Sequence, residues 1–79
     1  MTRDEVYKKL NEIFRDLFDD GTIVLTDKTT ADDIKGWDSL RHITLISAVE
    51  DEFGIELEMK DIVGLKNVGE LVDVIIREM

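Results

Sequence analysis

The chain has 79 residues, no cysteine and a formal net charge of −9. A chain of this length accommodates one domain, residues 1–79, which buries only about 60% of its unfolded surface. The lack of cysteine excludes disulfides and thiolate metal sites, and we expect no metal. No apolar run approaches the roughly 20 residues that span a bilayer, and the first five residues lack a signal-peptide core. We therefore expect a cytoplasmic protein without a membrane contact.

The negative charge is concentrated in the middle of the chain. Residues 19–61 contain twelve acidic and four basic side chains, whereas the charges of residues 1–18 cancel. Such a field repels nucleic acid and attracts basic protein surfaces. We expect no nucleic-acid partner and expect protein partners with basic patches. The plain alternative is that the acidic residues only keep a small domain in solution.

The first helix is predicted to begin near Thr2, because Thr2 and Glu5 have the spacing of a capping box. Apolar residues then recur on one helical face, and Gly21 is the predicted stop. They are Val6, Leu10, Ile13, Phe14 and Leu17.

Residues 21–37 lack helical periodicity. The apolar segment Ile23-Val24-Leu25 resembles a strand, but no second strand of similar quality exists to pair with it. We therefore predict a long loop whose apolar residues pack under the helices. A short helical turn is expected at residues 30–33, with Ile34 directed inward.

A second long helix is predicted from Ser39 to about Phe53, with Gly54 as its stop. Asp38 precedes it as a cap that accepts a backbone N–H of the first turn. Ser39 then lies at the positive end of the helix dipole, where a phosphate group is favoured.

Two further helices complete the predicted fold. Residues 59–63 form one or two turns that end at Gly64, and Asn67 with Glu70 has the capping spacing that opens the last helix. The fold class is all-α: a small four-helix bundle, three main helices plus one short helix, with a long loop between the first two helices. We expect a monomer.

The motif Asp38-Ser39-Leu40 at a helix start, in an acidic chain of this size that also contains Phe53-Gly54-Ile55, resembles the acyl carrier protein family. The resemblance implies that a phosphopantetheinyl transferase attaches 4′-phosphopantetheine from coenzyme A to Ser39. It further implies that the thiol of this arm holds acyl groups as thioesters for acyl-loading and acyl-processing enzymes. In this interpretation the chain has no catalytic residues of its own.

Three alternatives compete with the carrier interpretation. Ser39 can be an ordinary helix-start residue of an unmodified acidic interaction domain. A serine hydrolase would need a Gly-Asp-Ser-Leu motif, which Trp37 interrupts here, and a base, for which His42 is the only histidine. We instead expect His42 to be a surface residue beside the attachment site. A calcium loop starting at Asp16 fails because Phe18 occupies a ligand position.

The resemblance also implies a partner surface and an acyl cleft. Arg41 and Thr44 replace acidic residues that carriers of fatty-acid synthesis usually have, which favours a specialised pathway, with an aminoacyl or peptidyl carrier as the alternative. The partner-binding candidates are Arg41, Thr44, Glu50, Asp51, Glu58 and Asp61. Leu40 and the residues Ile43, Ile46, Ile62 and Ile75 are the candidates for the cleft.

Overall fold

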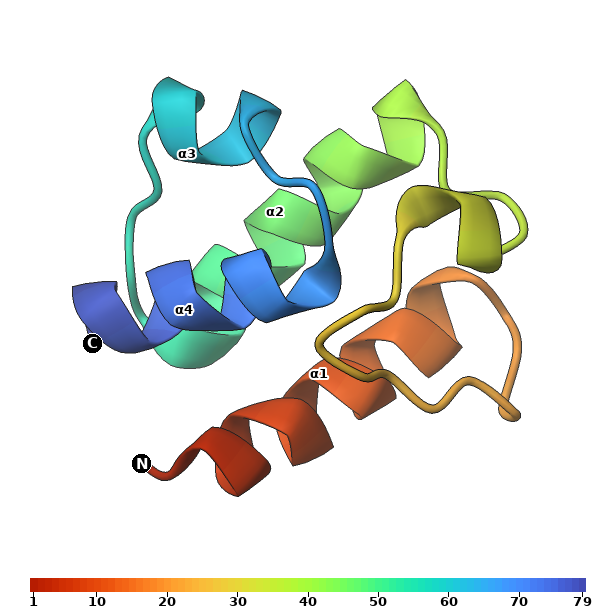
Figure 1. Cartoon of the computed structure of the whole chain (residues 1–79), viewed down its shortest axis with the longest axis horizontal. Coiled ribbons are helices and arrows are strands. Elements are labelled where there is room, and N and C mark those ends of the chain that lie inside the picture. The colour runs from red at the N-terminus through yellow and green to blue at the C-terminus, as the bar shows by residue number, and fades with distance from the viewer.

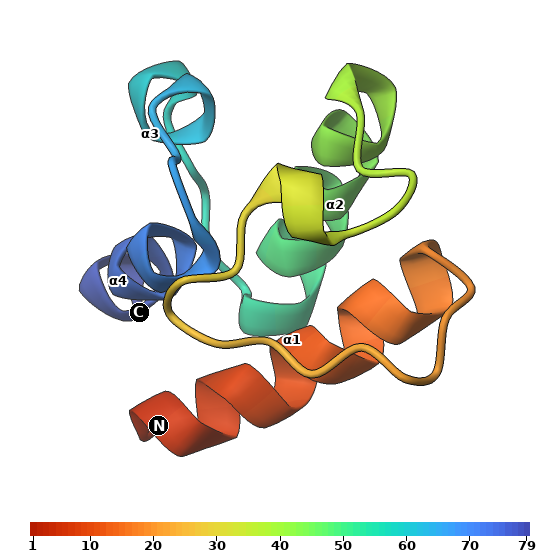
Figure 2. The ribbon, with the colours of Figure 1, turned by 45° about the vertical axis from the view of Figure 1, so that its right-hand side comes forward.

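A computed structural model describes all residues 1–79 and contains helices only, which confirms the predicted fold class. Its elements in chain order are α1 (Arg3–Leu17), the 3₁₀ turn η1 (Ala31–Asp33), α2 (Ser39–Phe53), α3 (Met59–Val63) and α4 (Val68–Glu78). Figures 1 and 2 both place α1 and α3 on opposite sides of the molecule with α4 between them, and α2 runs beside α4. None of the helices has the length and apolar character needed to cross a membrane.

The start of α1 agrees with the prediction, and its end does not. Thr2 and Glu5 form a reciprocal capping box. The helix ends at Leu17 instead of near Gly21, because Asp19 adopts a left-handed conformation with φ 51° and the Asp20 amide bonds back to the Arg15 carbonyl. Aspartate tolerates this conformation better than most residues, so it closes the helix in the position that glycine usually occupies.

The long loop is held against the helices by its backbone. The Leu25 amide donates to the side-chain oxygen of Asn11, and the Arg15 guanidinium donates to the Ile23 carbonyl, both contacts joining the loop to α1. Ile23 and Leu25 are buried as predicted, while Val24 between them points to solvent. No strand forms, and the expected helical turn is η1.

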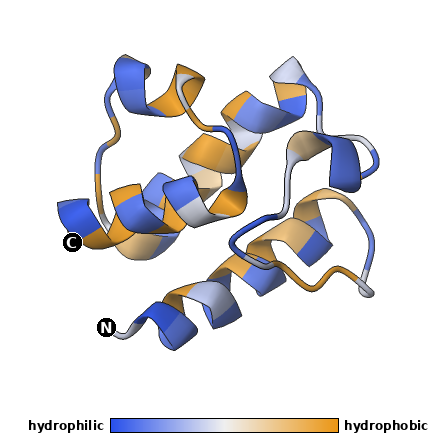
Figure 3. Cartoon of the chain, viewed as in Figure 1, coloured by the Kyte–Doolittle hydropathy of each residue, from blue (hydrophilic) through white to orange (hydrophobic).

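One core of fourteen buried apolar residues lies where α1, α2 and α4 meet. Figure 3 shows the apolar stripes of these helices facing one another and the polar stripes facing outward. The ends of α2 and α4 agree with the sequence: Gly54 ends α2 with φ 65°, and the Asn67 side chain accepts the Glu70 amide at the start of α4. The start of α2 is thus presented on a packed base of three helices.

Candidate functional site

Ser39 is the first residue of α2 and is exposed. Asp38 Oδ1 accepts the Arg41 amide across 2.8 Å, which satisfies one of the unpaired N–H groups of the first helical turn. The Ser39 hydroxyl therefore lies in a fixed first turn, open to another enzyme and at the end of the helix that favours a negative group.

Trp37 anchors the chain just before this turn. Its ring packs edge-on against Phe14 of α1 with centroids 5.2 Å apart, and it also lies 6.2 Å from the ring of Phe18. The loop that leads to Ser39 is thereby attached to the first helix. Aromatic packing of this kind stabilises the fold beyond the contribution from burial of the rings alone.

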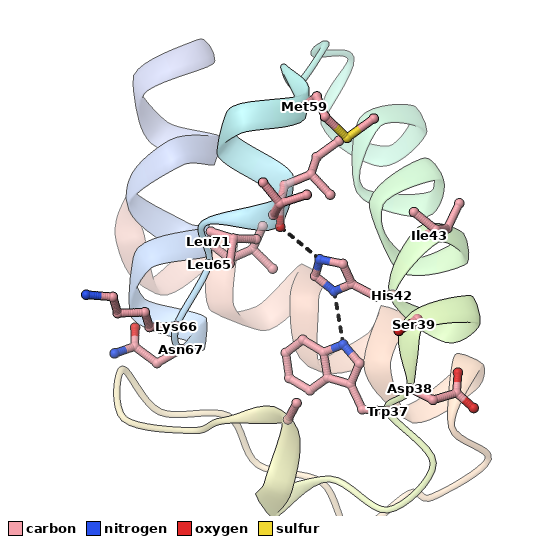
Figure 4. A pocket seen from close by; sticks show the side chains of 13 residues that line it. Trp37, Asp38, Ser39, His42, Ile43, Met59, Leu65, Lys66, Asn67 and Leu71 are labelled. Atoms are coloured by element: carbon pink, nitrogen blue, oxygen red, sulfur yellow. Dashed lines mark hydrogen bonds between the residues drawn. The ribbon is translucent and has the colours of Figure 1, made fainter.

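A cavity of about 530 Å³ opens beside Ser39, between the start of α2, helix α3 and the segment that enters α4. Figure 4 shows Ser39 and Asp38 at one side of it and Lys66 with Asn67 at the other. Its lining is mostly apolar and consists of Ala31, Trp37, Asp38, Ser39, His42, Ile43, Met59, Ile62, Val63, Leu65, Lys66, Asn67 and Leu71. A flexible group attached at Ser39 has an apolar space within immediate reach.

His42 crosses this cavity instead of lying free on the surface. Its Nδ1 accepts the indole N–H of Trp37 across 3.0 Å, and its Nε2 lies 3.1 Å from the carbonyl oxygen of Ile62 in α3. Because Nδ1 accepts, the proton of the neutral ring is on Nε2, which donates to the carbonyl. The expectation of a plain surface histidine was wrong. Both ring nitrogens are occupied, so His42 is not positioned as a base for Ser39.

The predicted cleft residues separate into two groups. Ile43 and Ile62 line the cavity. Ile46 and Ile75 do not line it: they are 4% and 0% exposed and belong to the core. Leu40 is 76% exposed and belongs neither to the cavity lining nor to the core. Helical spacing alone does not distinguish a core face from the rim of a cavity, since both require apolar residues one turn apart.

The predicted partner residues differ in how free they are. Thr44, Asp51 and Glu58 are exposed, and Glu58 also forms an ion pair with the exposed Lys60 across 3.5 Å. Glu50 instead accepts the Leu57 amide, and Asp61 forms an ion pair with Arg77 of α4 across 2.8 Å.

Arg41 is exposed, and its guanidinium donates to the Leu17 carbonyl at the end of α1 across 3.3 Å. It therefore also caps α1.

Sequence analysis missed several cavity residues, among them Met59, Val63 and Leu65. The available signal was their apolar character next to the charged pair Lys60 and Asp61. The bond between His42 and the Ile62 carbonyl had no signal, because a backbone oxygen carries no sequence information.

No cluster of three or more potential metal ligands exists, and Asp16 of the calcium-loop match lies within α1.

The comparisons with known proteins agree with this arrangement. The family model described as the phosphopantetheine attachment site matches residues 8–75. The acyl carrier protein of Petrotoga mobilis is 34% identical over 76 residues, 95% of this chain and 88% of its own length. That of Clostridium perfringens is 36% identical over 70 residues, 89% and 92% of the two chains. The solution structure of holo acyl carrier protein from Geobacter metallireducens has a TM-score of 0.85 and 43% identity, covering 91% of this chain and 83% of that one.

The fold and the site define a small helical carrier domain. The chain belongs to the acyl carrier protein family and has its phosphopantetheine attachment domain. It functions as an acyl carrier, with 4′-phosphopantetheine attached covalently, and it interacts with enzymes that load and process acyl groups. The site fits this group, because an exposed hydroxyl at a helix N-terminus adjoins an apolar cavity.

Proposed function

We propose that Ser39 is the attachment residue and that the chain, as one domain and a monomer, has no catalytic activity of its own. The observation that supports this is the position of Ser39: an exposed hydroxyl on the first turn of α2, at the edge of the cavity. A transferase would join the Ser39 oxygen to the phosphorus of coenzyme A that bears the pantetheine. The phosphoanhydride bond breaks, the adenosine bisphosphate leaves, and the hydroxyl proton passes to the transferase. Transferase, donor and chain must meet in one compartment, which we propose is the cytoplasm.

The chain offers a matched control for this assignment. Ser47 is the only other serine, and it is also exposed on α2 but lies in the middle of the helix. The experiment is intact-mass measurement after incubation with a broad-specificity transferase, magnesium and coenzyme A. Wild type and Ser47→Ala should gain one phosphopantetheine, and Ser39→Ala should gain none. A gain in Ser39→Ala would assign another residue. No gain in folded wild type would favour an unmodified acidic interaction domain.

We further propose that the carried group is an acyl chain of a specialised pathway. Arg41 and Thr44 lie on the exposed side of α2. The cavity lining is mostly apolar, which suits a hydrocarbon better than a charged aminoacyl group. Basic patches on partner enzymes would meet the exposed carboxylates Asp51 and Glu58. Loading assays with fatty-acyl, polyketide-type and aminoacyl donors test this, and preferential aminoacyl loading would contradict it.

A further inference from the structure

Helix α3 is attached to the rest of the molecule by few contacts. None of its five residues is buried, and Met59 and Val63 are 68% and 73% exposed. Ile62 is the α3 side chain that packs against the core. Two polar contacts add to this packing: the ion pair of Asp61 with Arg77 on α4, and the bond from His42 on α2 to the Ile62 carbonyl. The position of α3 therefore depends strongly on individual polar contacts.

The imidazole of His42 joins three segments that are separate in the chain. Its own helix starts at Ser39, its Nδ1 binds the loop residue Trp37, and its Nε2 binds α3. The ring also stacks on the Trp37 indole, with centroids 5.9 Å apart and planes inclined by 23°. Figure 4 shows the chain of two bonds, from Trp37 through His42 to α3, running across the cavity. A group that enters from Ser39 meets this chain of contacts.

We propose that His42 is a positioning residue that holds α3 over the cavity and thereby sets how often the cavity opens to a group carried on Ser39. The indole of Trp37 orients the imidazole and fixes its tautomer, and Nε2–H then holds the Ile62 carbonyl. The role in cargo entry rests on the proposed attachment at Ser39. The role in holding α3 is a property of the unmodified chain as well, so the two can be tested separately.

Two substitutions distinguish the two bonds of the ring. Glutamine can place an amide N–H near the position of Nε2, so His42→Gln retains the donor to Ile62. Asparagine is shorter and mimics the Nδ1 side, so His42→Asn retains an acceptor for Trp37 and loses the bond to α3. One hydrogen bond changes an opening equilibrium by roughly two- to tenfold. The two variants therefore differ in the hydrogen bond to the Ile62 carbonyl, and both keep a polar side chain at position 42.

The first test uses hydrogen exchange of the unmodified chain. The amides of Asp61 and Ile62 in α3 donate to the carbonyl of Glu58, the residue just before this helix, and their exchange reports opening of α3. His42→Asn should accelerate it by roughly two- to tenfold, and His42→Gln should leave it near wild type. Amides of buried α1 residues provide the reference for global stability. Equal acceleration throughout the chain, or unchanged α3 exchange in His42→Asn, would overturn the proposal.

The second test uses the loaded carrier. Intact mass first confirms loading; failure to load would reject Ser39 as the attachment residue and leave the exchange test of His42 intact. Saturated acyl thioesters of increasing length are then cleaved with hydroxylamine. In wild type and His42→Gln, cleavage should slow as the chain lengthens, and in His42→Asn this protection should fall several-fold. Ser47→Ala, an exposed change on α2, is the control. Equal cleavage in wild type and His42→Asn at every length would overturn the role in cargo entry.

Discussion

The Gly69 amide donates a hydrogen bond to the Asp27 carbonyl across 3.0 Å, and the adjacent Val68 amide donates to the Thr29 carbonyl across 2.8 Å. The long loop thus satisfies two N–H groups at the start of α4 that no helical carbonyl can reach. These bonds join the loop to the last helix, while Trp37 joins it to the first. The segment before Ser39 is consequently held from both sides.

Gly69→Ala should lower the free energy of unfolding by about 1 to 2 kcal/mol, because overpacking against the backbone outweighs the better helix propensity of alanine. A Cβ at Gly69 would lie 2.8 Å from the Asp27 carbonyl oxygen. Gly21→Ala is the matched control, since nothing lies within 4 Å of its added Cβ. Urea unfolding of the two variants measures the difference. Equal stability of both would show that the loop moves freely away from α4.

Tyr7→Phe should make the protein less sensitive to alkali. Partial burial, and then the hydrogen bond to Asp27, raise the pKa of Tyr7 to about 12. Because the folded pKa lies above the ordinary value of about 10, this contribution to stability is complete below pH 10 and is lost as the pH rises towards 12. Wild type should therefore lose more stability over this range than Tyr7→Phe. Tyr7 is the only tyrosine, so its absorbance titration reports the pKa directly.

A separate pH dependence is expected at the acid end. The hydrogen bond from Tyr7, followed by that from Arg3, lowers the pKa of Asp27. A lowered folded pKa gives stability that is present above the unfolded value of about 3.9 and is lost as the pH falls through the folded pKa. Arg3→Gln should therefore be less stable than wild type at neutral pH and approach it in acid. A pH-independent difference in urea midpoint would assign the effect of Arg3 to packing.

Much of this fold follows from local patterns in the sequence. The capping residues Thr2, Asp38 and Asn67, and the stop at Gly54, predict helix ends because each satisfies an unpaired backbone group next to it in the chain. The prediction that α1 ends near Gly21 was wrong because aspartate adopts a left-handed conformation less often than glycine. Asp19 therefore gives a weaker signal than Gly21.

The cavity was less predictable than the helices. Ile43 and Ile62 line it, whereas Ile46 and Ile75 lie in the core, although all four have apolar side chains at helical spacing. Which side of α2 meets the core depends on the crossing of three helices, and that arrangement is not a local property. The contacts of His42 are likewise tertiary: a loop indole on one side and the backbone of α3 on the other.

Asp38 is expected to act through its cap. Asp38→Ala removes the acceptor of the Arg41 amide and should cost about 1 kcal/mol of stability, whereas Asp38→Asn retains an acceptor and should cost only a few tenths. The rate of loading by the transferase distinguishes the effect of the lost cap from the effect of the lost negative charge. If the cap alone positions Ser39, Asp38→Asn is loaded at nearly the wild-type rate and Asp38→Ala more slowly. Equally slow loading of both variants would assign the negative charge a direct role with the transferase.

Arg41 has two roles to separate. Its guanidinium contacts the end of α1, and the residue also stands where the family resemblance implies an acidic residue in carriers of fatty-acid synthesis. Arg41→Gln removes the charge next to the Leu17 carbonyl and should cost about 0.3 to 1 kcal/mol. Arg41→Asp in addition creates the acidic residue that a basic partner would attract. If Arg41 rejects fatty-acid-type enzymes, kcat/KM with such an enzyme should rise several-fold in Arg41→Asp at low salt and less in Arg41→Gln.

The salt dependence completes the test of Arg41. An electrostatic effect on encounter should shrink as the ionic strength rises, because the exposed charges of carrier and partner are screened. A gain that persists at high salt would instead come from the changed contact at the end of α1. Unchanged turnover in Arg41→Asp, with the fold intact by urea unfolding, would remove Arg41 as the discriminating residue. Partner choice would then rest on Thr44 or on the acidic residues further along the chain.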